Sequence, residues 1–186
     1  MPASPPPTMP PDENSLLEVF KMAGKGQKLW RAIVDTPFAD PLAATNLGLG
    51  IVVLLLADAK IKLLRRVALS NTPSADGALR LSAKPFHEIS IPLDYKQNLI
   101  IQAITTGEPQ QTADWQHLFA PDLSPREARL NQAGAGVECS AIYPFKGRKR
   151  AGALIFSFYE PPEGITPTHR VFMQTYTDAV GQCLNG

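Results

Sequence analysis

The most apolar run in the chain constrains its fold more than any other feature. Residues 50–56 read Gly-Ile-Val-Val-Leu-Leu-Leu, with no polar alternation. Such a run is typical of a central strand that is covered on both faces. The wider apolar stretch, Leu47 to Ala57, is about half the length that a membrane-spanning helix needs. We therefore expect a buried strand here.

Hydrophobic spacing and capping residues predict the other elements. Ser15, with Glu18 three residues later, indicates a capped helix start, followed by one interrupted helix or two short ones up to about Asp35. Residues 60–70 are expected to form a hairpin with the apolar strand, turning at 57–59, whereas 71–85 are rich in turn formers and receive no element. Further helices are expected over 40–48, 98–106, 124–134 and 166–184, and further strands over 87–91, 110–113, 137–145 and 151–159.

The order of these elements predicts the architecture. Helices, a hairpin, a strand, helices, a hairpin and a helix give an α+β fold with an antiparallel sheet. The terminal helices are expected on one face and the middle connections on the other. A length of 186 residues suits one domain. We divide it into a disordered proline-rich tail (1–14), a helical segment (15–37) and the main domain (38–186).

Composition and charge exclude several kinds of partner. The net charge of +1 gives no strong attraction to nucleic acid or to an anionic membrane. The N-terminus has neither the basic start nor the apolar core of a signal peptide, so we expect a cytoplasmic protein. Cys139 and Cys183 are expected to be buried thiols in a reducing compartment. The tail could be a linker or a ligand for a proline-recognising partner.

No recognisable catalytic or metal-binding pattern is present. His87, His117 and His169 are scattered, and none has an acidic or cysteine partner at ligand spacing. The chain lacks a G-x-S-x-G elbow, a Walker loop and a Rossmann glycine pattern. We therefore expect no metal and no enzyme activity. Basic runs at 60–66 and 146–150 could be solvated hairpin tips, or together a cationic edge for a phosphate or an acidic partner.

Three segments, in their order and spacing, resemble a GAF domain. The first is 89–93 followed by Ala-Ile-Thr-Thr-Gly-Glu-Pro at 103–109, the second is Cys-Ser-Ala-Ile-Tyr-Pro-Phe at 139–145, and the third is Arg-Ala-Gly-Ala-Leu-Ile-Phe at 150–156. The resemblance covers about 38–184. It implies a six-stranded antiparallel sheet with a pocket under the middle helices and loops, binding of a small molecule or of other proteins, and dimers that form through the terminal helices.

The chain also departs from several members of that family. It has no NKFDE-type motif of cyclic-nucleotide-binding members and no Cys-His dipeptide for tetrapyrrole attachment. Only Cys139 lies near the region where the family's free-methionine-sulfoxide reductases place several cysteines. The cofactor therefore stays unknown.

The resemblance also suggests candidate pocket residues. Ser140 and Ile142 share one face of their strand, and Ser140 occupies the family's strand serine, which tends to face the cavity. The expected apolar walls are Phe86, Trp115 and Phe156, with a charge from Arg66 or Arg129. Alternatively, these aromatic side chains fill a collapsed core.

Three functions remain open at this point. The first is a sensory or regulatory GAF-like module for signal transduction, which binds a small molecule and signals through dimer or partner contacts. The second is a ligand-free interaction or assembly domain. The third and most remote is an enzyme like the free-methionine-sulfoxide reductases, in which Cys139 would react.

Overall fold

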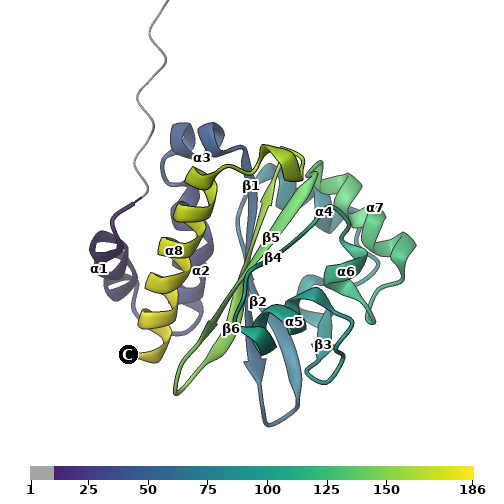
Figure 1. Ribbon diagram of the computed structural model, residues 1–186, viewed down its shortest axis with the longest axis horizontal. Helices are drawn as coiled ribbons and strands as arrows, with labels where there is room; N and C mark the ends of the chain where they lie inside the picture. The colour runs from purple at the N-terminus through teal and green to yellow at the C-terminus, as the bar shows by residue number, and fades with distance from the viewer. Residues whose placement is uncertain (1–10) are drawn as a thin grey trace, which may run out of the picture.

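A six-stranded antiparallel sheet forms the centre of the computed structural model, which describes residues 11–186 (Figure 1). The strand order is β3-β2-β1-β6-β5-β4, so the predicted apolar strand, β1, lies inside the sheet. The six strands are β1 (Leu49–Asp58), β2 (Leu63–Leu69), β3 (Ser90–Pro92), β4 (Gln110–Thr112), β5 (Cys139–Lys146) and β6 (Ala151–Phe158). The expectation of a disordered tail falls mainly on residues 1–10, outside the described part.

Helices cover both faces of the sheet, as predicted (Figure 1). One face carries α1 (Glu13–Ala23), α2 (Gln27–Asp35) and α8 (Pro167–Asn185); the other carries α4 (Pro73–Arg80), α5 (Leu99–Thr106), α6 (Gln116–Phe119) and α7 (Pro125–Ala135). The remaining helical pieces are α3 (Pro41–Leu47) and three 3-10 turns at Thr36–Phe38, Phe86–Glu88 and Pro162–Gly164. Within residues 11–186, no helix is both long and apolar enough to cross a membrane.

The terminal helices use their apolar faces against their own sheet. Phe20 of α1 and Tyr176 of α8 are fully buried, and their rings meet edge to face with centroids 5.8 Å apart. The Tyr176 hydroxyl also donates to the Ile33 carbonyl of α2 at 2.6 Å. The segment expected over 15–37 is therefore part of the main core. Its principal apolar stripe is buried against the same chain and is not left exposed for a partner.

Several boundaries differ from the predicted ones. Helix α1 begins at Glu13 because Asp12, not Ser15, is its N-cap and accepts from the Ser15 N–H. The first hairpin turns after Asp58, whose carboxylate accepts from the N–H of Lys60, so β2 starts three residues later than expected. Much of the strand expected over 87–91 is a 3-10 turn, and β3 is confined to three residues.

Helix α4 is the element that the sequence reading did not identify. Thr72 caps it by accepting from the Ala75 N–H. Its sequence, Pro-Ser-Ala-Asp-Gly-Ala-Leu-Arg, mixes good helix formers with Ser, Asp and Gly, and a helix this short needs tertiary packing to be stable. Gly77 of α4 meets Gly134 of α7 backbone to backbone: a Cβ atom at Gly77 would lie 2.1 Å from the Gly134 carbonyl oxygen. These two glycines allow the helices to touch.

Capping residues fix the ends of two of the expected helices. Ser124 and Glu127 form a reciprocal capping box at the start of α7. Asn98 caps α5 and Gly107 ends it with a positive φ of 74°. The two basic hairpin tips lie at the same end of the sheet, because β1 and β6 are antiparallel and Leu56 pairs with Gly152. Both turns are exposed, but Arg66 at the end of the first basic run is buried.

Candidate functional site

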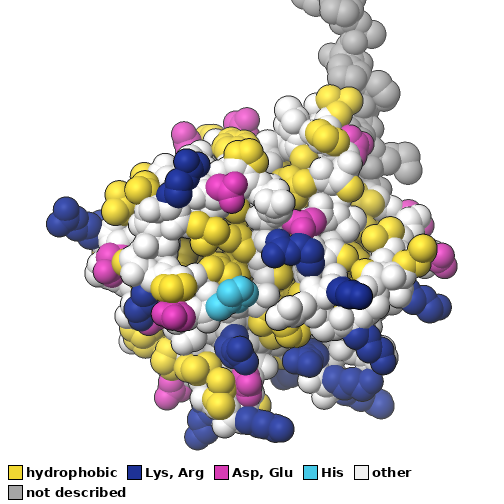
Figure 2. Space-filling model, turned by 180° about the vertical axis from the view of Figure 1, so that it is seen from behind, with side chains coloured by type: hydrophobic (Ala, Val, Ile, Leu, Met, Phe, Trp, Pro, Cys, Tyr) yellow, Lys and Arg dark blue, Asp and Glu magenta, His cyan; other side chains and the backbone are white. Residues whose placement is uncertain are grey.

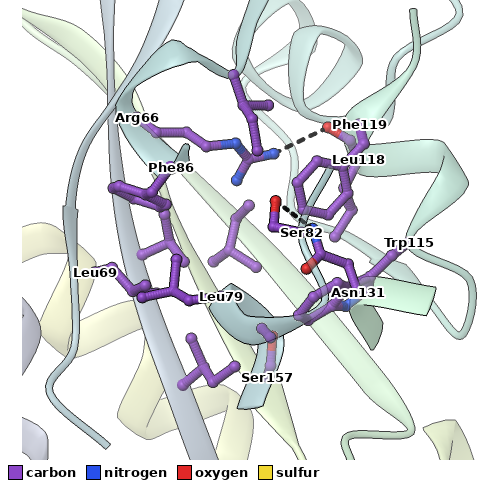
Figure 3. Close-up of a pocket in the computed structure, with 15 residues that line it drawn as sticks. Arg66, Leu69, Leu79, Ser82, Phe86, Trp115, Leu118, Phe119, Asn131 and Ser157 are labelled. Atoms are coloured by element: carbon purple, nitrogen blue, oxygen red, sulfur yellow. Dashed lines mark hydrogen bonds between the residues drawn. The ribbon is translucent and has the colours of Figure 1, made fainter. Parts of the chain in front are cut away.

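A cavity lies between the sheet and the layer of α4, α6 and α7. The space-filling view shows apolar side chains inside a hollow on its left half (Figure 2). The cavity has a volume of about 40 Å³, which is room for about three water molecules. Its lining residues, several of which Figure 3 labels, are Ile51, Val53, Arg66, Leu69, Ala78, Leu79, Ser82, Phe86, Ile89, Trp115, Leu118, Phe119, Asn131, Ile155 and Ser157.

Arg66 supplies the one charged side chain among these lining residues (Figure 3). The residue is only 4% exposed. Its Nη2 donates to the Leu118 carbonyl at 3.3 Å, and its guanidinium carbon lies 4.2 Å from the centroid of the Phe119 ring. Its Nε is buried and has no hydrogen-bond partner among the described residues. Burial lowers the pKa of Arg66 to about 10, against an opposing effect of the Asp122 carboxylate. The guanidinium remains charged at neutral pH.

A β-bulge aims Arg66 into the cavity. On β1 the neighbours Leu54 and Leu55 pair with Ala68 and Arg66, so one residue of β2, Val67, is extra. An extra residue breaks the alternation of faces along a strand. As a result Arg66 faces the cavity, whereas Ala68, two positions on, packs with the terminal helices.

Acidic groups near Arg66 are already engaged. The Asp122 carboxylate lies 2.5 Å from the Lys84 ammonium and also accepts from the Ser90 N–H at 3.1 Å. The four ion pairs of residues 11–186 do not include Arg66. The cavity therefore holds a positive charge with no carboxylate bound to it.

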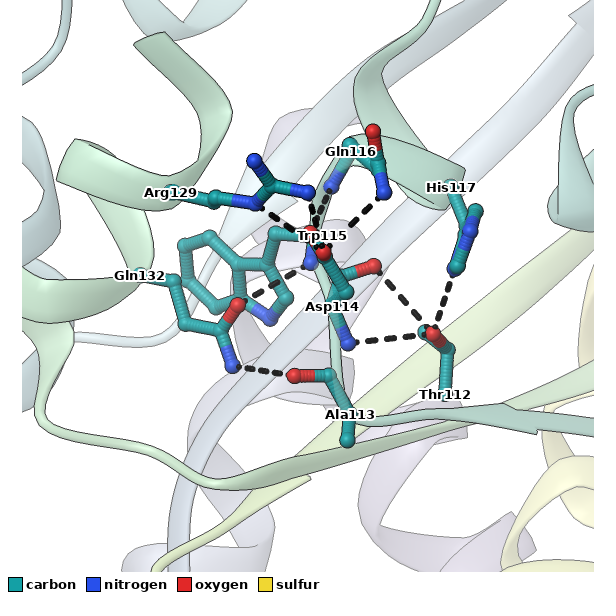
Figure 4. A network of polar contacts seen from close by, with 8 residues as sticks. All are labelled: Thr112, Ala113, Asp114, Trp115, Gln116, His117, Arg129 and Gln132. Atoms are coloured by element: carbon teal, nitrogen blue, oxygen red, sulfur yellow. Dashed lines mark hydrogen bonds and ion pairs between the residues drawn. The ribbon is translucent and has the colours of Figure 1, made fainter. Parts of the chain in front are cut away.

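Trp115 forms a wall that polar contacts fix in place. Its indole Nε1 donates to the Ser140 hydroxyl at 2.8 Å, and Ser140 shares a second hydrogen bond with Ser157 at 2.7 Å. Its backbone N–H donates to Gln132 Oε1 at 3.0 Å (Figure 4). The Trp115 ring also packs on Phe119, with centroids 5.5 Å apart. The indole is thus anchored at both its backbone and its side chain.

Asp114 organises the loop that carries Trp115 (Figure 4). Its Oδ2 accepts from both Nε and Nη2 of Arg129 at 3.0 Å, and its Oδ1 accepts from the Gln116 N–H at 2.9 Å. Partial burial tends to raise the pKa of the Asp114 carboxyl, but the Gln116 N–H and the Arg129 guanidinium outweigh burial and lower it. Arg129 therefore stabilises this loop through two hydrogen bonds to Asp114.

Asn131 places a second incompletely bonded group at the cavity. The residue is 3% exposed, and its Nδ2 makes a long hydrogen bond of 3.4 Å to the Ser82 hydroxyl. Its buried Oδ1 has no partner among the described residues. Two buried polar atoms of cavity-lining residues, Arg66 Nε and Asn131 Oδ1, thus have no hydrogen-bond partner among the described residues.

The structure brings together three of the seven candidate residues. Arg66, Phe86 and Trp115 line the cavity, whereas Ser140 lies behind it, bonded to Trp115 and Ser157. The other three are displaced: Arg129 pairs with Asp114, Ile142 is buried in the core on the cavity side of the sheet, and Phe156 lies on the opposite face against Phe172 and Tyr176. A role in ligand binding stays a prediction for all seven.

The face of Phe156 follows from strand alternation. Ile155 and Ser157 of β6 face the cavity, so Phe156 between them must face the terminal helices. Sequence reasoning missed Asn131 and Phe119 because their helices have no strong apolar stripe that fixes their rotation. Ser157 is different, because its position could have been inferred from the sequence. It lies opposite the candidate Ser140 in the β5–β6 hairpin, so the two serines share one face of the sheet.

Cys139 lies on the face opposite the cavity. It is fully buried among the residues that pack against the terminal helices. Burial raises the pKa of its thiol to about 11, with a smaller contribution from Glu163. Residues 11–186 contain no group of three or more His, Cys, Asp or Glu side chains placed to hold a metal ion.

Comparison with known proteins gives matches in structure only. No protein-family model matches the chain, and no curated protein matches it in sequence. Solved structures match over most of its length. One is the GAF domain of an Acinetobacter phosphoenolpyruvate-protein phosphotransferase, at 11% identity and a TM-score of 0.57, covering 92% of this chain and 89% of that one.

Two further structures show the range of similar proteins. The GAF domain of a two-component sensor histidine kinase from Bacillus halodurans is 15% identical, with a TM-score of 0.53, and covers 76% of this chain and 85% of that one. A free methionine-R-sulfoxide reductase from Neisseria meningitidis, in complex with its substrate, is 13% identical, with a TM-score of 0.53 and coverage of 92% and 87%. The GAF-like fold and the α+β class expected from the sequence are thereby confirmed.

Proposed function

We propose that this chain is a non-catalytic sensory or regulatory module that binds a small molecule in the Arg66 cavity and signals through contacts with another protein. The observation that carries the proposal is Arg66 itself, a buried charge with an unpaired Nε in an apolar cavity. Burying a charge without a counter-ion costs stability. A ligand that completes its bonding would offset that cost.

The position of α4 offers a route from the cavity to the surface. Leu79 of α4 lines the cavity and is also 44% exposed. Leu81, just after α4, and Leu130 of α7 are 43% and 50% exposed. A ligand that shifts α4 against α7 would change the surface that these leucines present. They are the contacts through which we expect the signal to pass.

The environment of Cys139 supports a role without catalysis. A reactive cysteine is accessible and has a lowered pKa. Cys139 is buried, its pKa is raised, and it does not line the cavity. The enzyme alternative would require turnover of free methionine sulfoxide that Cys139→Ser abolishes.

Self-association remains part of the proposal. Val19, Met22 and Val171 of the terminal helices α1 and α8 are exposed, Met22 to 88%. A homodimer would cover side chains of this kind. Sedimentation of the wild type and of Met22→Glu tests this, because only a dimer formed through α1 would dissociate in the variant.

Free thiols at both cysteines support a reducing compartment such as the cytoplasm.

A ligand screen tests the proposal against the ligand-free interaction domain. ¹⁵N-labelled protein would be mixed with a library of small neutral, cationic and anionic compounds and followed by NMR. The proposal predicts that at least one compound shifts the Trp115 indole N–H and the amides of the cavity residues in a saturable way. A library without any such compound would contradict ligand sensing, and the exposed leucines would then be read as a constitutive docking surface.

A further inference from the structure

The cavity has a chemical preference that follows from its only charged group. Arg66 is its single charged lining residue, and the acidic neighbour Asp122 is occupied by Lys84 and the Ser90 N–H. A lone guanidinium surrounded by apolar walls favours an anion, because attraction between charges is stronger where water is excluded. A cationic ligand would meet repulsion and find no acidic partner among the lining residues.

The geometry of the guanidinium limits where an anion can bind. One face of Arg66 is covered by the Phe119 ring at 4.2 Å, and Nη2 already donates to the Leu118 carbonyl. Nε is a buried donor without a hydrogen-bond partner among the described residues. A carboxylate is planar and accepts well from the edge of a guanidinium. It can therefore approach Nε without disturbing the stack on Phe119.

The volume of the cavity limits the length of the ligand. Room for about three water molecules corresponds to a ligand of roughly three to five non-hydrogen atoms. The open Oδ1 of Asn131 is an acceptor, so it favours a ligand that also carries a hydrogen-bond donor. That donor is better a hydroxyl than an ammonium group, because no carboxylate lines the cavity to balance a second positive charge.

We propose that the cavity binds a short hydroxy-monocarboxylate, of the size of glycolate, with its carboxylate on Arg66 Nε and its hydroxyl directed to Asn131. This inference rests on the proposed function and adds the chemical class of the ligand. A ligand this small is expected to bind with a dissociation constant on the order of 1 mM.

A comparison of four probes at constant ionic strength tests the ligand class. Glycolate, acetate, glycolamide and benzoate would be titrated into ¹⁵N-labelled protein, with the Trp115 indole N–H as reporter. We expect glycolate to bind about three-fold or more tighter than acetate. Glycolamide, which has the same shape without the charge, should bind at least about ten-fold weaker. Benzoate has a ring larger than the space of about 40 Å³ and should bind more weakly than glycolate.

Two arginine variants separate a specific site from general charge attraction. Arg66→Met should abolish the response to glycolate. Arg65→Met is the matched control: it removes the same charge from the next residue of β2, where the side chain is 55% exposed and faces away from the cavity. It should leave glycolate binding within about two-fold of wild type, since an exposed charge is screened by salt.

The possible results distinguish failure of the ligand assignment from failure of the proposed sensory function on which it rests. Equal binding of glycolamide and glycolate, or retained glycolate binding in folded Arg66→Met, would overturn the carboxylate assignment while a filled cavity still supports a sensor. If glycolate, glycolamide and every compound of the broader library failed to bind, both the ligand assignment and the proposed sensory function would be overturned. The comparison of glycolate with glycolamide uses only wild-type protein, so it decides the question even where a variant does not fold.

Discussion

Arg66 and Phe119 form a buried stack, with the guanidinium carbon 4.2 Å from the ring centroid. The two residues come from β2 and from α6 on the opposite wall. The stack and one carbonyl hydrogen bond are the principal contacts that hold the charge, and they leave Nε open. Arg66 is therefore better suited to bind something than to stabilise the empty fold.

The first prediction concerns the stability of the protein without ligand. Arg66→Met should leave the free energy of unfolding within about 1 kcal/mol of wild type or raise it, because it removes a buried charge with no counter-ion. The Leu118 carbonyl stays bonded, since Asn98 Nδ2 also donates to it at 3.0 Å. Urea unfolding measures the change. A loss of more than about 3 kcal/mol would show that Arg66 is a structural anchor.

The second prediction concerns the hydrogen bond between Trp115 and Ser140. Trp115→Phe, Ser140→Ala and the double variant form a cycle that isolates this bond. The coupling free energy should be about 1 kcal/mol, the usual net value for a buried hydrogen bond. Urea unfolding of all four proteins gives the coupling. Additive effects would mean that the indole N–H does not contribute to anchoring the wall.

The third prediction concerns the contact between α4 and α7. Gly134→Ala would place a Cβ atom 2.4 Å from the Gly77 carbonyl oxygen, so the helices must separate at a cost of about 2 to 3 kcal/mol. Thermal unfolding measures the cost. Gly181→Ala in α8 is the matched control, because its Cβ would lie 3.2 Å from the Phe145 Cβ, a much milder contact. It should change stability by less than about 1 kcal/mol, since alanine is the better helix former. Similar effects of both would contradict the close packing of α4 on α7.

The fourth prediction is a pH dependence from Cys139. The thiol titrates near 9 when unfolded and near 11 when folded, so the unfolded state loses its proton first as the pH rises. The stability contributed below pH 9 is then lost between pH 9 and 11, by at most about 3 kcal/mol. Unfolding curves at pH 8 and pH 11 should show a smaller alkaline loss in Cys139→Ala than in wild type.

Cys183 gives the control for this measurement. It is partly exposed, and burial raises its pKa. Cys183→Ala should retain most of the alkaline loss that Cys139→Ala removes. Tyr176, whose pKa burial raises well above its ordinary value, acts in the same direction and should leave a remaining loss in both variants. An equal reduction in the two variants would contradict the buried position of Cys139.

The sequence is sufficient for the sheet and insufficient for the cavity. Apolar runs and helix caps such as Ser124 and Asn98 are local signals, and they predict most elements correctly. The antiparallel sheet follows from the order of these elements, and the GAF-like arrangement from the resemblance of residues 89–93, 103–109, 139–145 and 150–156 to that family. The cavity depends instead on contacts between distant residues, which leave no local pattern.

Two particular features show why the site needed a structure. Simple alternation would place Leu64, Arg66 and Ala68 on one face of β2. The bulge at Val67 breaks this pattern, so Arg66 shares a face with Leu64 and not with Ala68. Helix α4 packs closely on α7 because Gly77 and Gly134 have no side chain, whereas Pro73, Ser74, Asp76 and Gly77 are residues typical of turns and obscure the helix in the sequence. Phe156, expected as an apolar wall of the pocket, faces the terminal helices because its neighbours in β6, Ile155 and Ser157, face the cavity.

The NMR resonance of the Arg66 Nε–H tests the central claim most directly. This donor has no partner among the described residues, so its chemical shift reports on whatever binds there. We predict a downfield shift of this resonance that saturates as glycolate is added, and no saturating shift of the exposed Arg65 Nε–H. An Arg66 Nε–H resonance that stays unchanged up to tens of millimolar glycolate, well above the expected dissociation constant, would contradict the account.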